Sequence, residues 1–144
     1  MKFKEGFVFL DHTADIMFQS YGGNLEEAFS NAVLAVSDSI TDYKKIEKNV
    51  KKEIEKESED LKALLYDFID ELLYLLDAEK FMAGEVKSIK IKKEKDKYIL
   101  KAVLLGDDKL DKYEIKTHIK AMTYNDMIID EKPGSVTLQV VLDI

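Results

Sequence analysis

Cysteine and tryptophan are absent from this chain of 144 residues, and proline occurs once. Without cysteine there can be no disulfide framework, no thiolate zinc or iron–sulfur site and no cysteine nucleophile. Arginine is absent as well, because all 22 basic residues are lysine. A nucleic-acid binder usually carries a basic face rich in arginine, whereas this chain has a net charge of −7. We therefore expect no direct, stable binding of nucleic acid.

Continuous apolar segments are short. The segment from Leu72 to Leu76 is among the longest, and it falls far below the ~18 residues that a membrane span needs. The beginning of the chain has no signal-peptide core, since only Phe7 to Leu10 is continuously apolar before Asp11. We expect a cytoplasmic protein without a membrane partner. The length fits one domain over residues 1–144, and a hydrophobic content of 46% is typical of a folded globule.

Charge is unevenly distributed along the chain. Residues 1–42 carry a net charge of −5 and residues 121–144 a net charge of −3, whereas residues 83–101 carry +4. Acidic segments suit hard cations or basic protein partners better than they suit phosphate. The two ends of the chain are therefore the places to look for a cation site.

The first part of the chain predicts two short strands followed by a helix. Phenylalanine and valine over residues 3–10 indicate one strand, and residues 16–21 indicate another. Apolar residues then recur at helical spacing over residues 25–40. Asn24 is the predicted N-cap of this helix, and Glu27 completes a pair that resembles a capping box.

A second helix is predicted after a weaker segment. Residues 49–57 alternate loosely and indicate at best an exposed strand. Ser58 is the predicted N-cap of the helix that follows, which has the broadest apolar face in the chain. That face consists of Leu61, Leu64, Leu65, Phe68, Ile69, Leu72, Leu73, Leu75 and Leu76. We expect it to form the main part of the core, or in part an interface.

Beyond Gly84 the pattern alternates with a period of two residues, which is typical of strands. Strands are expected over residues 86–91, 98–105, 115–122, 127–131 and 135–142. Between them, residues 106–108 are expected to form a loop and Lys132-Pro133-Gly134 a type II turn. Because the strands gather largely after the helices, we expect an α+β fold, in which a mostly antiparallel or mixed β-sheet packs with two amphipathic helices.

The chain has no recognisable nucleophile motif or nucleotide loop. Gly-x-Ser-x-Gly, the P-loop and Gly-x-Gly-x-x-Gly are all missing. The two histidines, His12 and His118, are too few for a zinc enzyme that has no thiols. A metal site would have to be built from carboxylates, whose oxygen atoms select calcium, magnesium or manganese.

Two carboxylate features are candidates for such a site. The segment from Asp11 to Asp15 lies between two predicted strands, where its acids either bind a metal or satisfy backbone groups in a local turn. At the other end, the α-carboxylate of Ile144 is one residue from the carboxylate of Asp143. The two carboxylates at this strand end either bind a hard cation together or have no ligand and only mark the end of the strand. Asp42 follows the first predicted helix. An aspartate at such a position more commonly caps the next turn than binds a metal.

Seven short motifs, spread over the whole chain, match one known family. They are Asp11 to Ile16, Tyr21-Gly22, Leu25 to Phe29, Thr41-Asp42, Glu114 to Thr117, Lys120 to Tyr124 and Leu142 to Ile144. Together, and in this order, they resemble the archease family. Asn125 stands where many members of that family carry a histidine, which argues against a catalytic role at this position.

The resemblance implies an accessory protein and not an enzyme. Archeases are partners of the RNA-splicing ligase that joins tRNA halves, and they are understood to promote guanylylation of that ligase and its multiple turnover. The resemblance also implies a divalent metal site formed by Asp15, Asp143 and the carboxylate of Ile144, with calcium as the usual ion and magnesium or manganese as alternatives. Asp11, His12 and Asp42 would surround that site.

Two other functions stay open at this point. A small phosphoester hydrolase that depends on a divalent metal could use the same carboxylates. A chaperone-like binding module could use the leucine-rich second helix, provided that the helix contributes to an exposed apolar patch of more than a few hundred Å².

Overall fold

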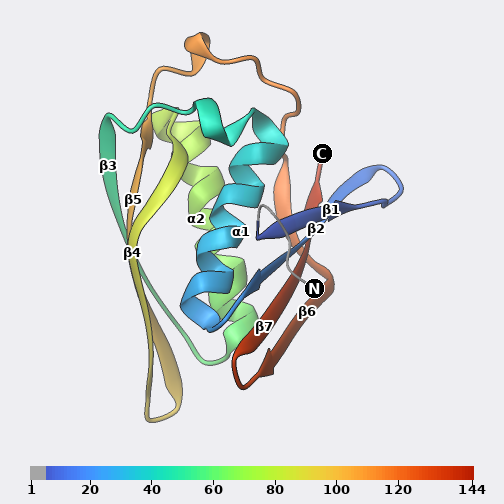
Figure 1. Cartoon of the computed structure of the whole chain (residues 1–144), viewed down its shortest axis with the longest axis vertical. Helices are drawn as coiled ribbons and strands as arrows, with labels where there is room; N and C mark the ends of the chain where they lie inside the picture. Colours follow the sequence, from blue (N-terminus) through green and yellow to red (C-terminus); the bar gives the residue numbers. More distant parts are fainter. Residues whose placement is uncertain (1–5) are drawn as a thin grey trace.

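The computed structural model describes residues 6–144, which form seven strands, two α-helices and two short 3₁₀ helices (Figure 1). The strands are β1 (Phe7–Leu10), β2 (Asp15–Gly22), β3 (Val50–Ser58), β4 (Met82–Glu94), β5 (Lys97–Asp107), β6 (Ala121–Lys132) and β7 (Ser135–Asp143). The helices are α1 (Leu25–Ile40), η1 (Tyr43–Lys45), α2 (Leu61–Glu79) and η2 (Leu110–Lys112). No helix within residues 6–144 is long and apolar enough to cross a membrane.

The elements are arranged in three layers, with both α-helices between two β-sheets (Figure 1). One sheet has the order β1-β2-β7-β6, and the other has the order β3-β5-β4. All pairings between the described strands are antiparallel. The α+β prediction is therefore confirmed, and the predicted sheet is in fact two sheets that enclose the helices.

The first helix follows its predicted boundaries. The Asn24 side chain accepts a hydrogen bond from the backbone N–H of Glu27 at 2.8 Å, as an N-cap does. The Glu27 carboxylate accepts from the backbone N–H of Gly23 at 3.0 Å, one residue before the partner that a standard capping box uses. The first bond satisfies a backbone donor that the start of a helix leaves unpaired, and the second ties the residue before the N-cap to the first turn.

The predicted N-cap of the second helix is wrong by two residues. Asp60 caps α2, because its side chain accepts from the backbone N–H of Ala63 at 2.8 Å. Ser58 is the last residue of β3, and its hydroxyl donates to the Asp67 carboxylate at 3.0 Å. The predicted exposed strand is therefore real and reaches Ser58, with Ile54 as its one fully buried side chain.

The leucine-rich face of α2 forms the centre of the core. Its fully buried residues are Leu64, Leu65, Phe68, Ile69, Leu72, Leu73 and Leu75. Phe68 stacks on Phe29 of α1, with ring centroids 6.0 Å apart. Because this face is enclosed between the two sheets, it does not supply the exposed apolar patch that a chaperone-like use of α2 would require.

Two predicted boundaries in the second half are wrong. Residues 106 and 107 belong to β5 and not to a loop, and Gly106 makes this possible because a Cβ there would collide with the carbonyl oxygen of Met82. Residues 115–120 form an irregular segment and not a strand. Their backbone is tied down by separate hydrogen bonds, such as the one from Lys116 N–H to the Ile40 carbonyl at 2.7 Å.

The turn between β6 and β7 agrees with the sequence pattern. Gly134 has a φ of 73°, which suits the third position of a type II turn and which other residues adopt at a cost. This turn sets the register in which Lys132 lies opposite Ser135, and after the irregularity between Thr123 and Ile128 a shifted register brings Ala121 opposite Asp143. The end of β7 is thereby placed between the ends of two other strands.

Candidate functional site

Asp15 and Asp143 lie directly opposite each other at one end of the β1-β2-β7-β6 sheet. Asp15 is the first residue of β2 and Asp143 the last residue of β7, and the antiparallel register pairs the two. Residues that face each other across an antiparallel pair point their side chains to the same face, with Cβ atoms about 4.5–5.5 Å apart. The fold therefore brings together two carboxylates that are 128 positions apart in the sequence.

The end of β7 is held on its other side as well. Ala121 of β6 is the partner of Asp143 there, and the backbone N–H of Lys120 donates to the Asp143 carbonyl at 2.8 Å. Ile144 follows at once, and its side chain is 40% exposed. Residue 144 is thus anchored by a strand that is paired on both sides up to the preceding residue.

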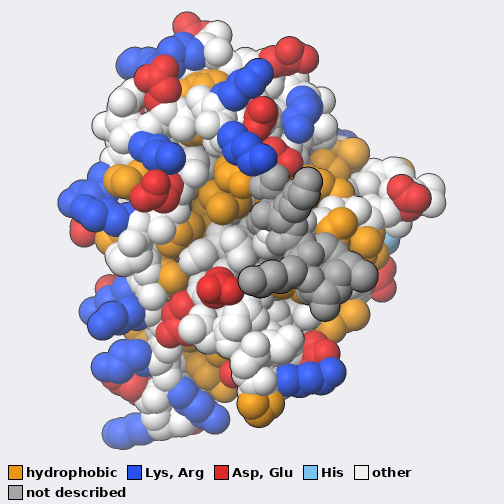
Figure 2. Space-filling view, in the orientation of Figure 1, with side chains coloured by type: hydrophobic (Ala, Val, Ile, Leu, Met, Phe, Trp, Pro, Cys, Tyr) orange, Lys and Arg blue, Asp and Glu red, His pale blue; other side chains and the backbone are white. Residues whose placement is uncertain are grey.

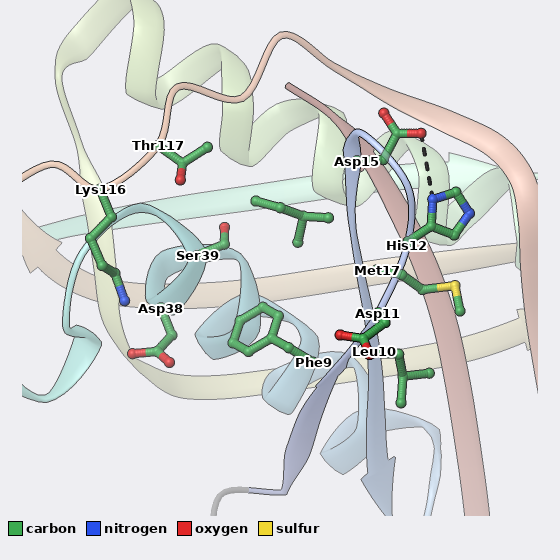
Figure 3. A pocket seen from close by; sticks show the side chains of 11 residues that line it. Phe9, Leu10, Asp11, His12, Asp15, Met17, Asp38, Ser39, Lys116 and Thr117 are labelled. Atoms are coloured by element: carbon green, nitrogen blue, oxygen red, sulfur yellow. Dashed lines mark ion pairs between the residues drawn. The ribbon is translucent and has the colours of Figure 1, made fainter.

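His12 links Asp15 to a second acid from a distant part of the chain. Its Nδ1 atom lies 3.6 Å from a carboxylate oxygen of Asp15, and its Nε2 atom lies 3.3 Å from a carboxylate oxygen of Asp126. The first of these contacts is drawn in Figure 3. The His12 Nδ1 atom is shielded from solvent and has no partner within hydrogen-bond distance among the described residues. The imidazole therefore lies between two carboxylates that come from distant parts of the chain.

Asp126 was not predicted to take part in this cluster. It lies in an irregularity of β6 between Thr123 and Ile128, and its φ of 56° is unusual for a residue other than glycine. The Gln139 side chain on β7 donates to the Asp126 carbonyl at 2.8 Å and fixes the bulge. The one sequence signal is Asn125-Asp126 within a strand pattern, since these two residue types tolerate the left-handed conformation best.

An open hollow of about 390 Å³ lies beside His12 and Asp15 (Figure 3). Apolar side chains of β1 and β2 line part of it, and Asp11, Asp38 and Lys116 add charged groups. The hydroxyl of Ser39 is not an activated nucleophile here, because it donates to the backbone carbonyl of Val36 at 2.6 Å. The hollow can thus hold a ligand, but it lacks a nucleophile paired with a base.

The three residues expected around the metal site, Asp11, His12 and Asp42, do not all line the hollow. Asp11 and His12 both line the hollow. Asp42 caps η1 instead, because its carboxylate accepts from the backbone N–H of Lys44 at 3.1 Å. The capping role that the sequence favours for Asp42 is confirmed, and Asp42 is not among the residues that line the hollow.

Two side-chain carboxylates alone make an incomplete metal centre. Among residues 6–144 there is no group of three or more His, Cys, Asp or Glu side chains that could hold a metal ion. Besides water, a third oxygen ligand beside Asp15 and Asp143 can come from the main chain, and the carboxylate of residue 144 is the nearest in sequence. The donor set fits a hard cation, because it consists of oxygen atoms only.

Comparison with known proteins points to one family. The sequence profile of the Archease protein family (MTH1598/TM1083) matches residues 7–144. The chain belongs to the archease family. The archease of Pyrococcus furiosus is 47% identical over 137 residues, which cover 93% of this chain and 95% of that protein. The archease of Sulfolobus acidocaldarius is 41% identical over 139 residues, which cover 96% and 98% of the two chains.

Solved structures agree with the archease assignment. The solution structure of protein 1598 from Methanobacterium thermoautotrophicum superposes with a TM-score of 0.84 at 36% identity, covering 97% of this chain and 99% of that one. A Thermotoga maritima crystal structure, described as an archease and possible chaperone, has a TM-score of 0.52 at 20% identity, with 94% of each chain covered. The second likeness supports the fold alone.

A charged network around the buried Asp107 holds the irregular segment that reaches the hollow beside His12 and Asp15. Asp107 at the end of β5 is 1% exposed, and it accepts from the Tyr113 hydroxyl at 2.5 Å and pairs with the Lys112 ammonium at 2.7 Å. Lys112 also pairs with Glu47 at 3.3 Å, and the backbone N–H of Glu47 donates to the Tyr113 hydroxyl at 2.9 Å. The network fixes the start of the segment whose later residue Lys116 lines the hollow.

The same network shifts the pKa values of its members. Burial alone would raise the pKa of Asp107, but the bonds from Lys112 and Tyr113 stabilise the carboxylate and lower its pKa to about 2. The Asp107 carboxylate raises the pKa of Lys112, despite the opposite effect of burial. Burial raises the pKa of Tyr113, and the hydrogen bond to Asp107 adds to that effect.

Proposed function

We propose that this archease is an activating partner of the tRNA-splicing RNA ligase and promotes its guanylylation and multiple turnover through an acidic, metal-binding tip. The tip is the end of the sheet where Asp15 and Asp143 face each other, next to residue 144. This juxtaposition is the observation that carries the proposal, because it matches the residues that the family resemblance assigned to a metal. The proposed function also implies a cytoplasmic protein that acts on another enzyme.

The rest of the molecule supports a helper role. The tip and its hollow contain carboxylates and a histidine but no activated nucleophile. On the face drawn in Figure 2, lysines alternate with acidic side chains and do not form a continuous basic surface. With a net charge of −7, the protein suits a basic protein surface better than it suits RNA phosphates.

The metal part of the proposal concerns three groups. Asp15, Asp143 and the carboxylate of Ile144 would hold a calcium ion, or magnesium or manganese in its place. When bound, such an ion can neutralise charge on phosphate oxygens during phosphoryl or nucleotidyl transfer. The chain's own contribution is to hold the carboxylates in register, since β7 is paired on both sides at Asp143.

A ligase assay at limiting ligase tests the proposal. We expect wild-type protein to raise the number of ligation turnovers per ligase and the guanylylated fraction. The double variant Asp15→Asn and Asp143→Asn should lose this activity. Asp42→Asn is the matched control, because it removes an exposed carboxylate that lies outside the tip.

Three results would contradict the proposal. Wild-type protein could leave ligase turnover unchanged, the double variant could activate fully, or the purified protein could by itself hydrolyse phosphoesters in a way that depends on Asp15. The last result would instead support the hydrolase alternative. Thermal melting must show that both variants remain folded, as expected for surface carboxylates, whose substitution usually changes stability by no more than about 0.5 kcal/mol.

A further inference from the structure

A second hollow lies between β6 and the first turn of α2, and it shares no lining residue with the hollow at the tip. Its volume is about 530 Å³, and it is open to solvent. Its walls carry Asp60 and Lys62 from the start of α2, and Tyr124 and Glu131 from β6. In Figure 1 these two elements run beside each other on the side of the β6–β7 turn.

Tyr124 presents an aromatic surface to this hollow. Its ring stacks on the ring of Tyr66 from α2, with centroids 4.3 Å apart and the planes inclined by 15°. Tyr66 covers one face of the Tyr124 ring, and Tyr124 lines the hollow whereas Tyr66 does not. Tyr124 is 52% exposed although Tyr66 covers one face of its ring, so the remaining surface of the ring is open to a ligand.

The charge around this aromatic surface is mainly negative. Asp60 and Glu131 line the hollow, against the single ammonium of Lys62. Burial raises the pKa of Tyr124, and the negative charges of Asp67 and Asp60 raise it further. A rigid, open tyrosine face with carboxylates at its rim is complementary to a guanidinium group, which stacks on aromatic rings and pairs with carboxylates.

We infer that this hollow binds an arginine side chain of the partner protein, with the open face of Tyr124 as its stacking surface. The inference rests on the proposed function, which makes that partner the RNA ligase. The arginine must come from another protein, because this chain contains only lysine. The hollow suits the role by position, since Tyr124 is three residues along β6 from Ala121, the neighbour of Asp143 at the tip.

Single-stranded RNA is the other ligand that stacks on tyrosine, but the charges oppose it. A base stacked on Tyr124 would bring its phosphates toward the carboxylates of Asp60 and Glu131. We therefore expect a labelled single-stranded RNA oligonucleotide not to bind the protein alone. RNA binding that is lost in Tyr124→Ala would overturn the inference.

The closing experiment measures the affinity of the intact ligase for tyrosine variants. Tyr124→Ala should raise the dissociation constant about tenfold or more, as truncation of a central aromatic contact does. Tyr124→Phe keeps the ring and should stay within about threefold of wild type. Glu131→Gln should weaken binding and reduce its dependence on salt, because it removes one charge from the rim.

Two exposed side chains provide matched controls. Tyr74 is 57% exposed on the later half of α2, and Ile128 is 46% exposed on β6 beside Gln139. Neither lines the hollow, so Tyr74→Ala and Ile128→Ala should bind the ligase like wild type. Equal weakening by Tyr74→Ala and Tyr124→Ala would overturn the inference, as would wild-type affinity in Tyr124→Ala.

Calcium binding separates this hollow from the tip. Tyr124→Ala should bind calcium as wild type does and should keep its thermal transition, because Tyr124 is neither a proposed metal ligand nor part of the core. If wild-type protein fails to bind or activate the ligase, the proposed function fails, and this inference fails with it. If wild-type protein activates and Tyr124→Ala does so with unchanged affinity, only the inference fails.

Discussion

Asp107 is the only Asp, Glu or Lys side chain in the described part of the chain that is fully buried. Its pKa of about 2 is below the ordinary value of 3.8, so the unfolded state binds more protons between these two values. The stabilisation by this carboxylate is therefore complete above about pH 4 and is lost as the pH falls toward 2. We expect the melting temperature to fall over this range, as measured by circular dichroism.

Asp107→Asn tests whether this residue causes the acid sensitivity. The amide keeps the shape but loses the charge that Lys112 and Tyr113 stabilise, so we expect a loss of roughly 1–3 kcal/mol in the free energy of unfolding at pH 7. The melting temperature of the variant should also depend less on pH between 4 and 2. A variant that melts like wild type at both pH values would contradict the role given to the network.

The carboxylate of residue 144 gives a prediction that no side-chain substitution can test. An appended C-terminal tag converts this carboxylate into an amide, which removes one negative charge and one ligand oxygen. Because hard cations depend on ligand charge and number, calcium affinity measured by calorimetry should fall strongly. Ile144→Val retains the carboxylate and should bind calcium normally, and so should protein tagged at the N-terminus. Unchanged affinity in the C-tagged form would restrict the site to side chains.

Among the elements, α1 was predicted best because its signals are local. Asn24 and Glu27 satisfy backbone donors at its start, and its apolar residues repeat at the helical period. Asn24→Ala should lower the free energy of unfolding by about 1 kcal/mol, the usual value of an N-cap, as measured by urea denaturation. Asn24→Asp should restore most of it, since aspartate caps equally well. Similar losses in both variants would mean that the cap bond is not the cause.

The strand predicted over residues 115–122 shows where local signals mislead. Ile115, Thr117 and Ile119 alternate with polar residues as in a strand, yet strand pairing begins only at Ala121. Apolar and polar residues alternate wherever an extended segment has one side buried and the other exposed. This segment is held by separate hydrogen bonds to Ile40 and Asp143, so it has a buried and an exposed side without pairing with a neighbouring strand. Neither partner is close in sequence, so the pattern could not distinguish the two cases.

The candidate site was only partly predictable for the same reason. Asp15 and Asp143 were found through the family resemblance, because their pairing depends on the register of β2 and β7. Asp126 and Asp38 come near the same region from a strand bulge and from α1, and the local pattern marks at most the bulge at Asp126, not its contact with His12. Asp42 became a candidate neighbour of the site because it lies in a family motif, and the structure shows that its carboxylate caps the next turn.

At the scale of the whole molecule, the net charge predicts how the rate of association with the proposed ligase partner depends on salt. If the proposed ligase presents a basic surface to this protein of charge −7, the two should associate faster at low salt. We expect the association rate constant to fall steeply as salt rises from about 50 to 500 mM, with a smaller change in the dissociation rate. Stopped-flow or surface plasmon resonance would measure both. An association rate that is independent of salt would contradict this electrostatic docking.

The position of β7 has a consequence for how the protein is made. β7 is the last strand in sequence order, yet it lies inside its sheet between β2 and β6. During synthesis β1 and β2 emerge first and must wait for a partner that comes more than 100 residues later. Pairing across so long a separation is slow, and the unpaired edge of β2 stays open meanwhile. The tip that joins Asp15 to Asp143 therefore forms only when the sheet closes, so a chain that stops before β7 has no such tip.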